Sequence, residues 1–196
     1  MHIVKALFVL GLGAFVAGCA TAPQVVPEEE QKDPQLLLEE RAGAVREAGG
    51  FVALRHASSL TLPAAQDRAL RRARVELAES VAARVVALQD AYLERADIAD
   101  PEPVQEWFTG VEQYLRDLIV GGARPVAEKQ LTDDGLSTVW VMVVEDPGAI
   151  VQAMEIRGAA DRRLFELVRA SRAHRELLAE AETFAEYRVS QDWMSD

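Results

Sequence analysis

The sequence predicts an α+β fold: a small antiparallel sheet of about three strands, packed by long helices and followed by a long C-terminal helical extension. Three observations support this prediction. Apolar residues recur at spacings of three and four in several long segments, as in helices with one buried face. Three Asp-Pro pairs precede such segments, which is typical of helix starts. Late in the chain, an Asp-Gly pair separates two extended apolar runs and predicts a β-hairpin.

The first 18 residues predict a signal peptide. Lys5 supplies the basic start, and Ala6–Val16 is apolar but too short to span a bilayer as a helix. The next residues, Val16-Ala17-Gly18-Cys19, resemble the lipobox of bacterial lipoproteins. That resemblance implies cleavage between Gly18 and Cys19 and transfer of a diacylglycerol to the Cys19 thiol, which suits cysteine because its thiolate is a strong nucleophile. The alternative is an uncleaved helix in which Cys19 is an ordinary small residue.

A lipidated Cys19 predicts attachment to the outer membrane, with the folded domain facing the periplasm. Two or three acyl chains, at roughly 0.8 kcal/mol per buried methylene group, hold a protein on a bilayer for long times. Ala20-Thr21 follows the cysteine, and the lack of an acidic residue there implies export to the outer membrane. The membrane is therefore the first expected partner.

The residues after Cys19 predict a flexible tether over 19–32 and a single domain over 33–196. The tether is rich in proline and acid and shows no apolar periodicity. Removing residues 1–18 leaves 178 residues and takes Lys5 away, so the net charge changes from −11 to −12. Such an acidic body is repelled by nucleic acid, which is excluded as a partner. With one cysteine, the fold has no internal disulfide.

The first elements of the domain are a short helix and a strand. Asp33-Pro34 begins the helix, and Gly49-Gly50 ends it. The run 51–56 (FVALRH) alternates imperfectly and is predicted as the strand.

A long helix is predicted from Pro63 to about Arg95. It has one apolar stripe, made of Leu70, Ala73, Leu77, Val81, Val85, Leu88 and Tyr92. At 1.5 Å per residue it is roughly 50 Å long and crosses one face of a small sheet. Its other side is interpreted as a solvated face rather than a recognition patch, and carries Asp67, Arg68, Arg71, Arg72, Arg74 and Glu76.

A second long helix is predicted between Asp100-Pro101 and Gly121-Gly122. Its apolar stripe contains Trp107, Phe108 and Tyr114. Packing against the sheet is the favoured interpretation. The alternative is that these aromatic side chains form one wall of a ligand pocket whose other wall is Trp140 and Met142.

The hairpin is predicted as strands 125–131 and 137–144, joined through Asp133-Asp134-Gly135. The second strand is apolar on both faces and belongs in the sheet interior, whereas Pro125 places the first nearer an edge. The last helical region begins at Asp146-Pro147 and runs past Phe184, with Gly158 as a possible break. Its far apolar cluster, Leu177, Leu178, Ala181 and Phe184, is expected to pack within the chain; the alternative is a partner helix.

Residues of about 49–155 resemble the twenty-kilodalton bacterial envelope lipoprotein family (Lpp-twenty). The residues that carry this resemblance are Gly50, Ala69, Ala73, Leu77, Ala78, Gly122, Trp140 and Val141. It implies a small α+β domain at the outer membrane, with relatives among flagellar assembly factors and no established catalytic residues. The segment beyond 156 lies outside the pattern.

The remaining motifs do not predict an enzyme, a cofactor or a metal site. His2 is lost with the signal peptide, and His56 and His174 are far apart, with no HExxH pair and no glycine-rich phosphate loop. A hydrolase built from His56 with Ser58 or Ser59 lacks a marked orienting acid. Two functions remain: a non-catalytic lipoprotein with a structural or assembly role, with envelope proteins or a second copy as partners, or a periplasmic module that binds a small or lipidic ligand.

Overall fold

The computed structural model describes residues 33–94 and 100–192. They belong to one compact unit, Lys32–Asp196. The predicted signal peptide, the Gly18–Cys19 cleavage site and the tether lie outside the described residues.

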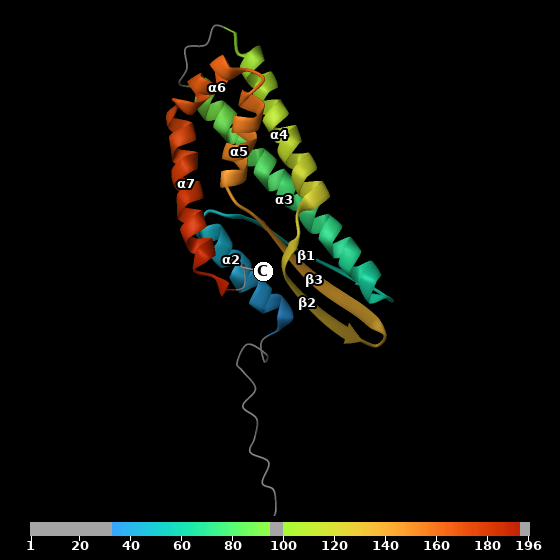
Figure 1. Cartoon of the computed structure of the whole chain (residues 1–196). Helices are drawn as coiled ribbons and strands as arrows, with labels where there is room; N and C mark the ends of the chain where they lie inside the picture. The colour runs from blue at the N-terminus through green and yellow to red at the C-terminus, as the bar shows by residue number, and fades with distance from the viewer. Residues whose placement is uncertain (1–32, 95–99, 193–196) are drawn as a thin grey trace, which may run out of the picture. The chain divides into compact units, whose positions relative to one another are not determined.

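The described residues form an antiparallel three-stranded sheet and six helices (Figure 1). The sheet order is β1-β3-β2, so β3 is central and β2 lies at an edge, as predicted. The α+β fold with a C-terminal helical region is confirmed. In chain order the elements are α2 (Pro34–Glu47), β1 (Phe51–Ser59), α3 (Leu62–Leu93), α4 (Glu102–Gly122), β2 (Pro125–Asp133), β3 (Leu136–Glu145), α5 (Gly148–Gly158), α6 (Arg162–Arg169) and α7 (Arg172–Val189).

All three Asp-Pro pairs lie at helix starts. In each, the aspartate Oδ1 accepts a hydrogen bond from the backbone N–H two residues later, at 2.8 Å for Asp33, 3.2 Å for Asp100 and 2.7 Å for Asp146. Each bond satisfies an amide that has no partner inside the helix. The local sequence therefore fixes where α2, α4 and α5 begin.

The predicted turn between β2 and β3 is a two-residue loop at Asp134-Gly135. Both residues have positive φ, 47° and 76° respectively. This conformation matches the right-handed twist of the strands that it joins, and Asp-Gly adopts it at low cost. The turn sets the pairing register in which Asp133 lies opposite Leu136.

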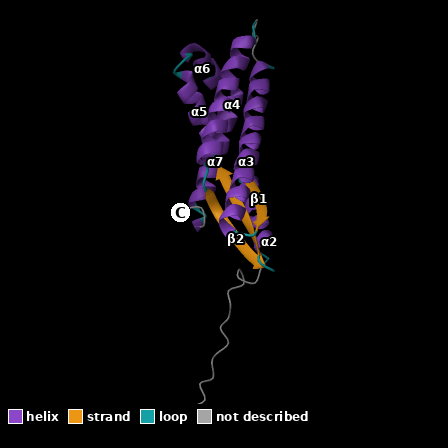
Figure 2. Cartoon of the chain, turned by 90° about the vertical axis from the view of Figure 1, so that its right-hand side faces the viewer, coloured by secondary structure: helices purple, strands orange, loops and turns teal. Residues whose placement is uncertain are grey.

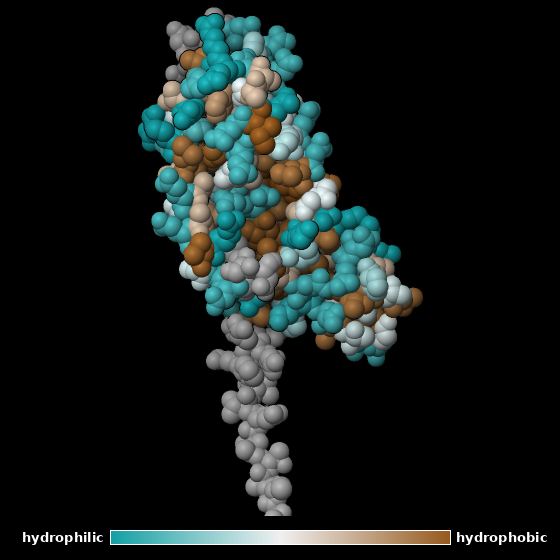
Figure 3. All heavy atoms as spheres, viewed as in Figure 1, coloured by the Kyte–Doolittle hydropathy of each residue, from teal (hydrophilic) through white to brown (hydrophobic). Residues whose placement is uncertain are grey.

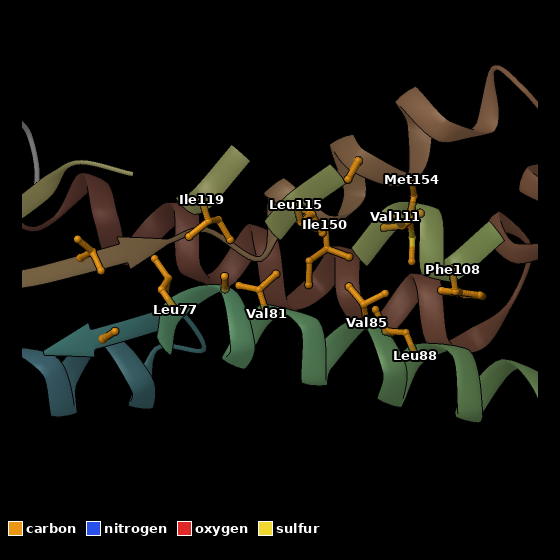
Figure 4. Close-up of a cluster of buried hydrophobic side chains, with 14 of the residues drawn as sticks. Leu77, Val81, Val85, Leu88, Phe108, Val111, Leu115, Ile119, Ile150 and Met154 are labelled. Atoms are coloured by element: carbon orange, nitrogen blue, oxygen red, sulfur yellow. The ribbon is translucent and has the colours of Figure 1, made fainter. Parts of the chain in front are cut away.

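The first half of α3 packs on the sheet and the second half packs on other helices (Figure 2). Alanines face the sheet in the first half, at positions 65, 69 and 73. Because alanine is small, the helix approaches the strands closely. Figure 4 shows the second half, where side chains of α3 meet those of α4 and α5: Leu77, Val81, Val85, Leu88, Phe108, Val111, Leu115, Ile119, Ile150 and Met154.

The opposite face of the sheet has a smaller core, formed with α2 and α7. Val52 of β1 and Met142 of β3 are buried there with Ala42, Val45 and Phe184. Side chains alternate along β3, so Val141 and Val143 lie in the α3 core while Met142 lies in this one. The central strand is thus buried on both sides, as its apolar sequence predicts.

The C-terminal extension is three helices. Gly158 ends α5, which is one of the two alternatives that the sequence leaves open, and a second break separates α6 from α7 at Ala170-Ser171. Leu177 and Phe184 are fully buried within the chain, whereas Leu178 is exposed. The prediction of intramolecular packing is confirmed for these two residues, which are therefore not available to a partner helix.

Candidate functional site

Exposed leucines gather at the end of the sheet where the hairpin turns. Leu131 lies opposite Thr138, and Leu136 is two residues before Thr138 on β3, so both leucines point to the α2 face. Leu60 directly follows β1 at the same end. The exposed fractions are 83% for Leu60, 51% for Leu131 and 43% for Leu136. We call these three residues the leucine tip, and apolar side chains are visible at the hairpin end in Figure 3.

His56 lies on the same face of the sheet as the leucine tip. Its ring is exposed, 6.2 Å from the Trp140 ring between centroids. Ser58 Oγ shares a hydrogen bond with Thr138 Oγ1 at 2.8 Å. Among residues 33–94 and 100–192, no group of three or more His, Cys, Asp or Glu side chains is placed to hold a metal ion.

The ligand pocket that the alternative interpretation places between α4 and β3 is not formed there. Trp107 and Phe108 pack edge to face, with centroids 5.1 Å apart, inside the α3 core. Met142 lies in the core on the other side of the sheet, and Trp140 shares its face because the two are separated by two positions. The two walls are therefore on opposite sides of the sheet, and this alternative is wrong. The favoured interpretation, in which α4 packs against the sheet, is wrong as well, because α4 packs on α3 and α5.

The arginine-rich side of α3 is only partly the solvated face that the sequence suggests. Arg68, Arg71 and Arg72 are exposed. Arg74 is half-buried, and its Nε donates to the Ala123 carbonyl at 2.8 Å. Glu76 pairs with Arg55 of β1 at 2.6 Å. Arg72 also donates to the His56 carbonyl of β1 at 3.4 Å. Three side chains of the expected solvent face thus connect α3 to neighbouring elements, a role that helical spacing alone does not reveal.

A pocket of about 400 Å³ lies at the opposite end of α3, where this helix meets α6 and α7. Its lining is mostly apolar: Ala91, Tyr92, Leu167, Ala170, Ser171, Arg172 and Ala173. Three of these residues, Tyr92, Ser171 and Ala173, also line a small inner space beside His174. The pocket was missed from the sequence because its walls come from three helices.

His174 is the most unusual polar residue of this region. It is only 4% exposed, and neither ring nitrogen has a hydrogen-bond partner among the described residues. Burial lowers the pKa of His174, the charge of Arg169 lowers it further, and Glu155 acts in the opposite direction. The ring is therefore a neutral, unpaired group at neutral pH. In sequence it looks like any other helical residue.

Within the described residues, no helix combines the length and the apolar character that crossing a bilayer requires. Comparisons with protein-family models, with curated proteins and with solved structures found no match to the chain. The resemblance to the envelope lipoprotein family therefore stays a prediction.

Proposed function

We propose that the chain is a lipoprotein of the bacterial outer membrane that has no catalytic role and uses its periplasmic domain to dock another envelope protein. The observation that carries this proposal is the order of residues at the N-terminus: one basic residue, an apolar stretch, small residues and then Cys19. The resemblance of residues 49–155 to the envelope lipoprotein family supports the same role.

The net charge of the protein and the length of the segment between Cys19 and the domain both fit a lipid anchor. A net charge of −11 disfavours adsorption on anionic head groups, so a covalent lipid is the better means of attachment. Thirteen residues, positions 20–32, separate Cys19 from the described unit. Fully extended, they reach roughly 45 Å. The domain is therefore able to contact partners in the periplasm while the lipid on Cys19 stays in the membrane.

The leucine tip is the surface that we assign to the partner. Three large apolar side chains share one end of an otherwise acidic protein, and grouped exposed apolar residues are typical of protein-binding sites. The adjoining Ser58 and Thr138 hydroxyls bond to each other and add a polar border. An envelope protein with an apolar groove is the expected partner.

Mass spectrometry of the mature N-terminus tests the anchor. The native protein is expected to begin at Cys19 and to carry acyl chains. Cys19→Ser is expected to leave an unacylated precursor that is lost from the membrane fraction, while Thr21→Ser, two residues away, keeps both cleavage and attachment. A native chain that begins at Met1 with a free thiol would overturn the proposal.

Photocrosslinking in cells tests the docking surface. A photoreactive residue at Leu136 is expected to capture one envelope protein, and the additional substitution Leu131→Asp to abolish the capture. Val86 of α3 is the matched control, because its exposed fraction is 44%, against 43% for Leu136. Equal capture from both positions, or capture of only a second copy of the chain, would contradict the assignment.

A further inference from the structure

The pocket between α3, α6 and α7 is shaped for the apolar part of a small molecule. Tyr92 of α3, Leu167 of α6 and Ala170 at the end of α6 supply apolar surface, and Arg172 is the one charged residue among the described residues of the lining. Its volume of about 400 Å³ lies in the lower part of the range found for ligand sites. A compact ligand therefore suits it better than a large cofactor.

The His174 ring lies directly behind this lining. It faces the inner space that shares Tyr92, Ser171 and Ala173 with the pocket. Buried polar groups in folded proteins almost always have a partner, so a ring with two unpaired nitrogens calls for an explanation. The inner space holds no position large enough for a water molecule. A ligand group therefore reaches His174 only when side chains that separate the pocket from this inner space move aside.

The start of α7 favours an anionic group at this position. Ser171 caps α7, an 18-residue helix, and its Oγ accepts the His174 backbone N–H at 3.2 Å. The positive end of the helix dipole is therefore next to the pocket.

The charged side chains around the ring are of both signs. Arg169 of α6 adds positive charge and is itself paired with Glu166 at 4.0 Å, while Glu155 of α5 opposes it. From the other helices, α4 contributes the apolar Phe108 and α3 contributes Tyr92. At the rim, Arg172 is paired with Glu176 at 2.5 Å. An anion bound at His174 adds the favourable charge that the buried ring needs in order to hold a proton.

We propose that this pocket binds a small anionic amphiphile, whose acyl chain lies against Tyr92, Leu167 and Ala170 and whose acidic group accepts a hydrogen bond from His174. Binding is then coupled to uptake of one proton by the His174 ring. The shared chemistry is a carboxylate or a phosphate on a short chain. The inference is independent of the proposed anchor, because it rests only on residues of the described unit.

Titration of the histidine rings by NMR, with octanoate and octanol as probes, tests the acidic contact. The full chain carries Cys19→Ser, so that no acyl group of its own competes, and His174→Phe assigns the signal. Octanoate is expected to raise the pKa of His174 by about one unit or more, since a paired opposite charge has that effect. Octanol is expected to leave the pKa of His174 unchanged. The ring signals of the exposed His56 are expected not to shift when octanoate is added. No rise with octanoate, or an equal rise with octanol, would overturn the proposal.

Two substitutions test the position of the site. His174→Phe is expected to weaken octanoate binding about tenfold or more, because a charge-assisted hydrogen bond is lost. Ala170→Trp fills the mouth of the pocket from an exposed position and is expected to abolish binding while the melting temperature stays the same. The control is Ala83→Trp, at an exposed alanine of α3 outside the pocket lining, which is expected to keep binding. Unchanged binding by Ala170→Trp would place the ligand elsewhere, as would equal losses in both tryptophan variants.

Discussion

The Phe184 ring of α7 lies against the backbone of Gly50, where α2 gives way to β1. A Cβ at Gly50 would be 2.2 Å from Phe184 Cε2, far inside contact distance. The two residues are 134 positions apart (184 − 50), so this contact joins the C-terminal helix α7 to the start of β1. The absence of a side chain at Gly50 is what allows the C-terminal helix to close over the sheet.

Gly50→Ala is expected to destabilise the protein by about 1–3 kcal/mol, because the added methyl group displaces a fully buried ring. Unfolding in urea, followed by circular dichroism, measures the change. Gly43→Ala is the matched control: nothing lies within 4 Å of its Cβ position inside α2, so it is expected to stabilise the helix by about 0.5–1 kcal/mol. Equal effects of the two substitutions would show that Phe184 does not set the cost at Gly50.

Stability is expected to fall when the solution is acidified below about pH 6.5, through His174. Burial lowers the pKa of this ring from its ordinary value of 6.5. The unfolded chain then binds a proton more readily than the folded one as the pH falls from 6.5 to the lowered pKa, and this difference favours unfolding. Urea unfolding at several pH values measures the slope. His174→Leu is expected to flatten it, whereas His56→Leu, at an exposed position, is not.

Glu145→Gln is expected to stabilise the protein at neutral pH by less than about 1 kcal/mol. Burial at the end of β3 is the main cause that raises the pKa of Glu145 above its ordinary 4.5. The folded state therefore resists ionisation more than the unfolded state, and its stability is lost as the pH rises above 4.5 towards the raised pKa. Glu182→Gln removes the same charge from an exposed position on α7 and separates this effect from general repulsion. Equal gains from both variants at pH 7 would assign the effect to net charge.

The ion pair between Arg84 and Glu180 is expected to contribute little despite its good geometry. One guanidinium nitrogen lies 2.6 Å and 2.8 Å from the two carboxylate oxygens and joins α3 to α7. Both side chains are partly exposed, so their coupling in a double-mutant cycle with alanine should be below about 1 kcal/mol. It should shrink further in 1 M salt. A larger coupling that resists salt would mean that the pair holds α7 in place.

The sequence by itself determined the elements and much of the sheet. Asp33, Asp100 and Asp146 each accept a hydrogen bond from a backbone N–H two residues later. The Asp134-Gly135 turn likewise depends on two adjacent residues. Because these interactions are local, they can be predicted from the sequence. The break at Ser171 also had a local signal, because serine is a common helix cap and its Oγ accepts the His174 N–H, but the apolar periodicity on either side concealed it.

Only the tertiary structure decided which apolar side chains meet. Trp107 and Met142 both belong to apolar stripes, yet they lie on opposite sides of β3, since alternation assigns a residue to a face but does not say which helix covers that face. The burial of His174 likewise depends on α3, α4, α5 and α6 closing around the first turn of α7. Burial and pocket shape depend on contacts between segments that are distant in sequence. The spacing of neighbouring residues does not encode which of these contacts form.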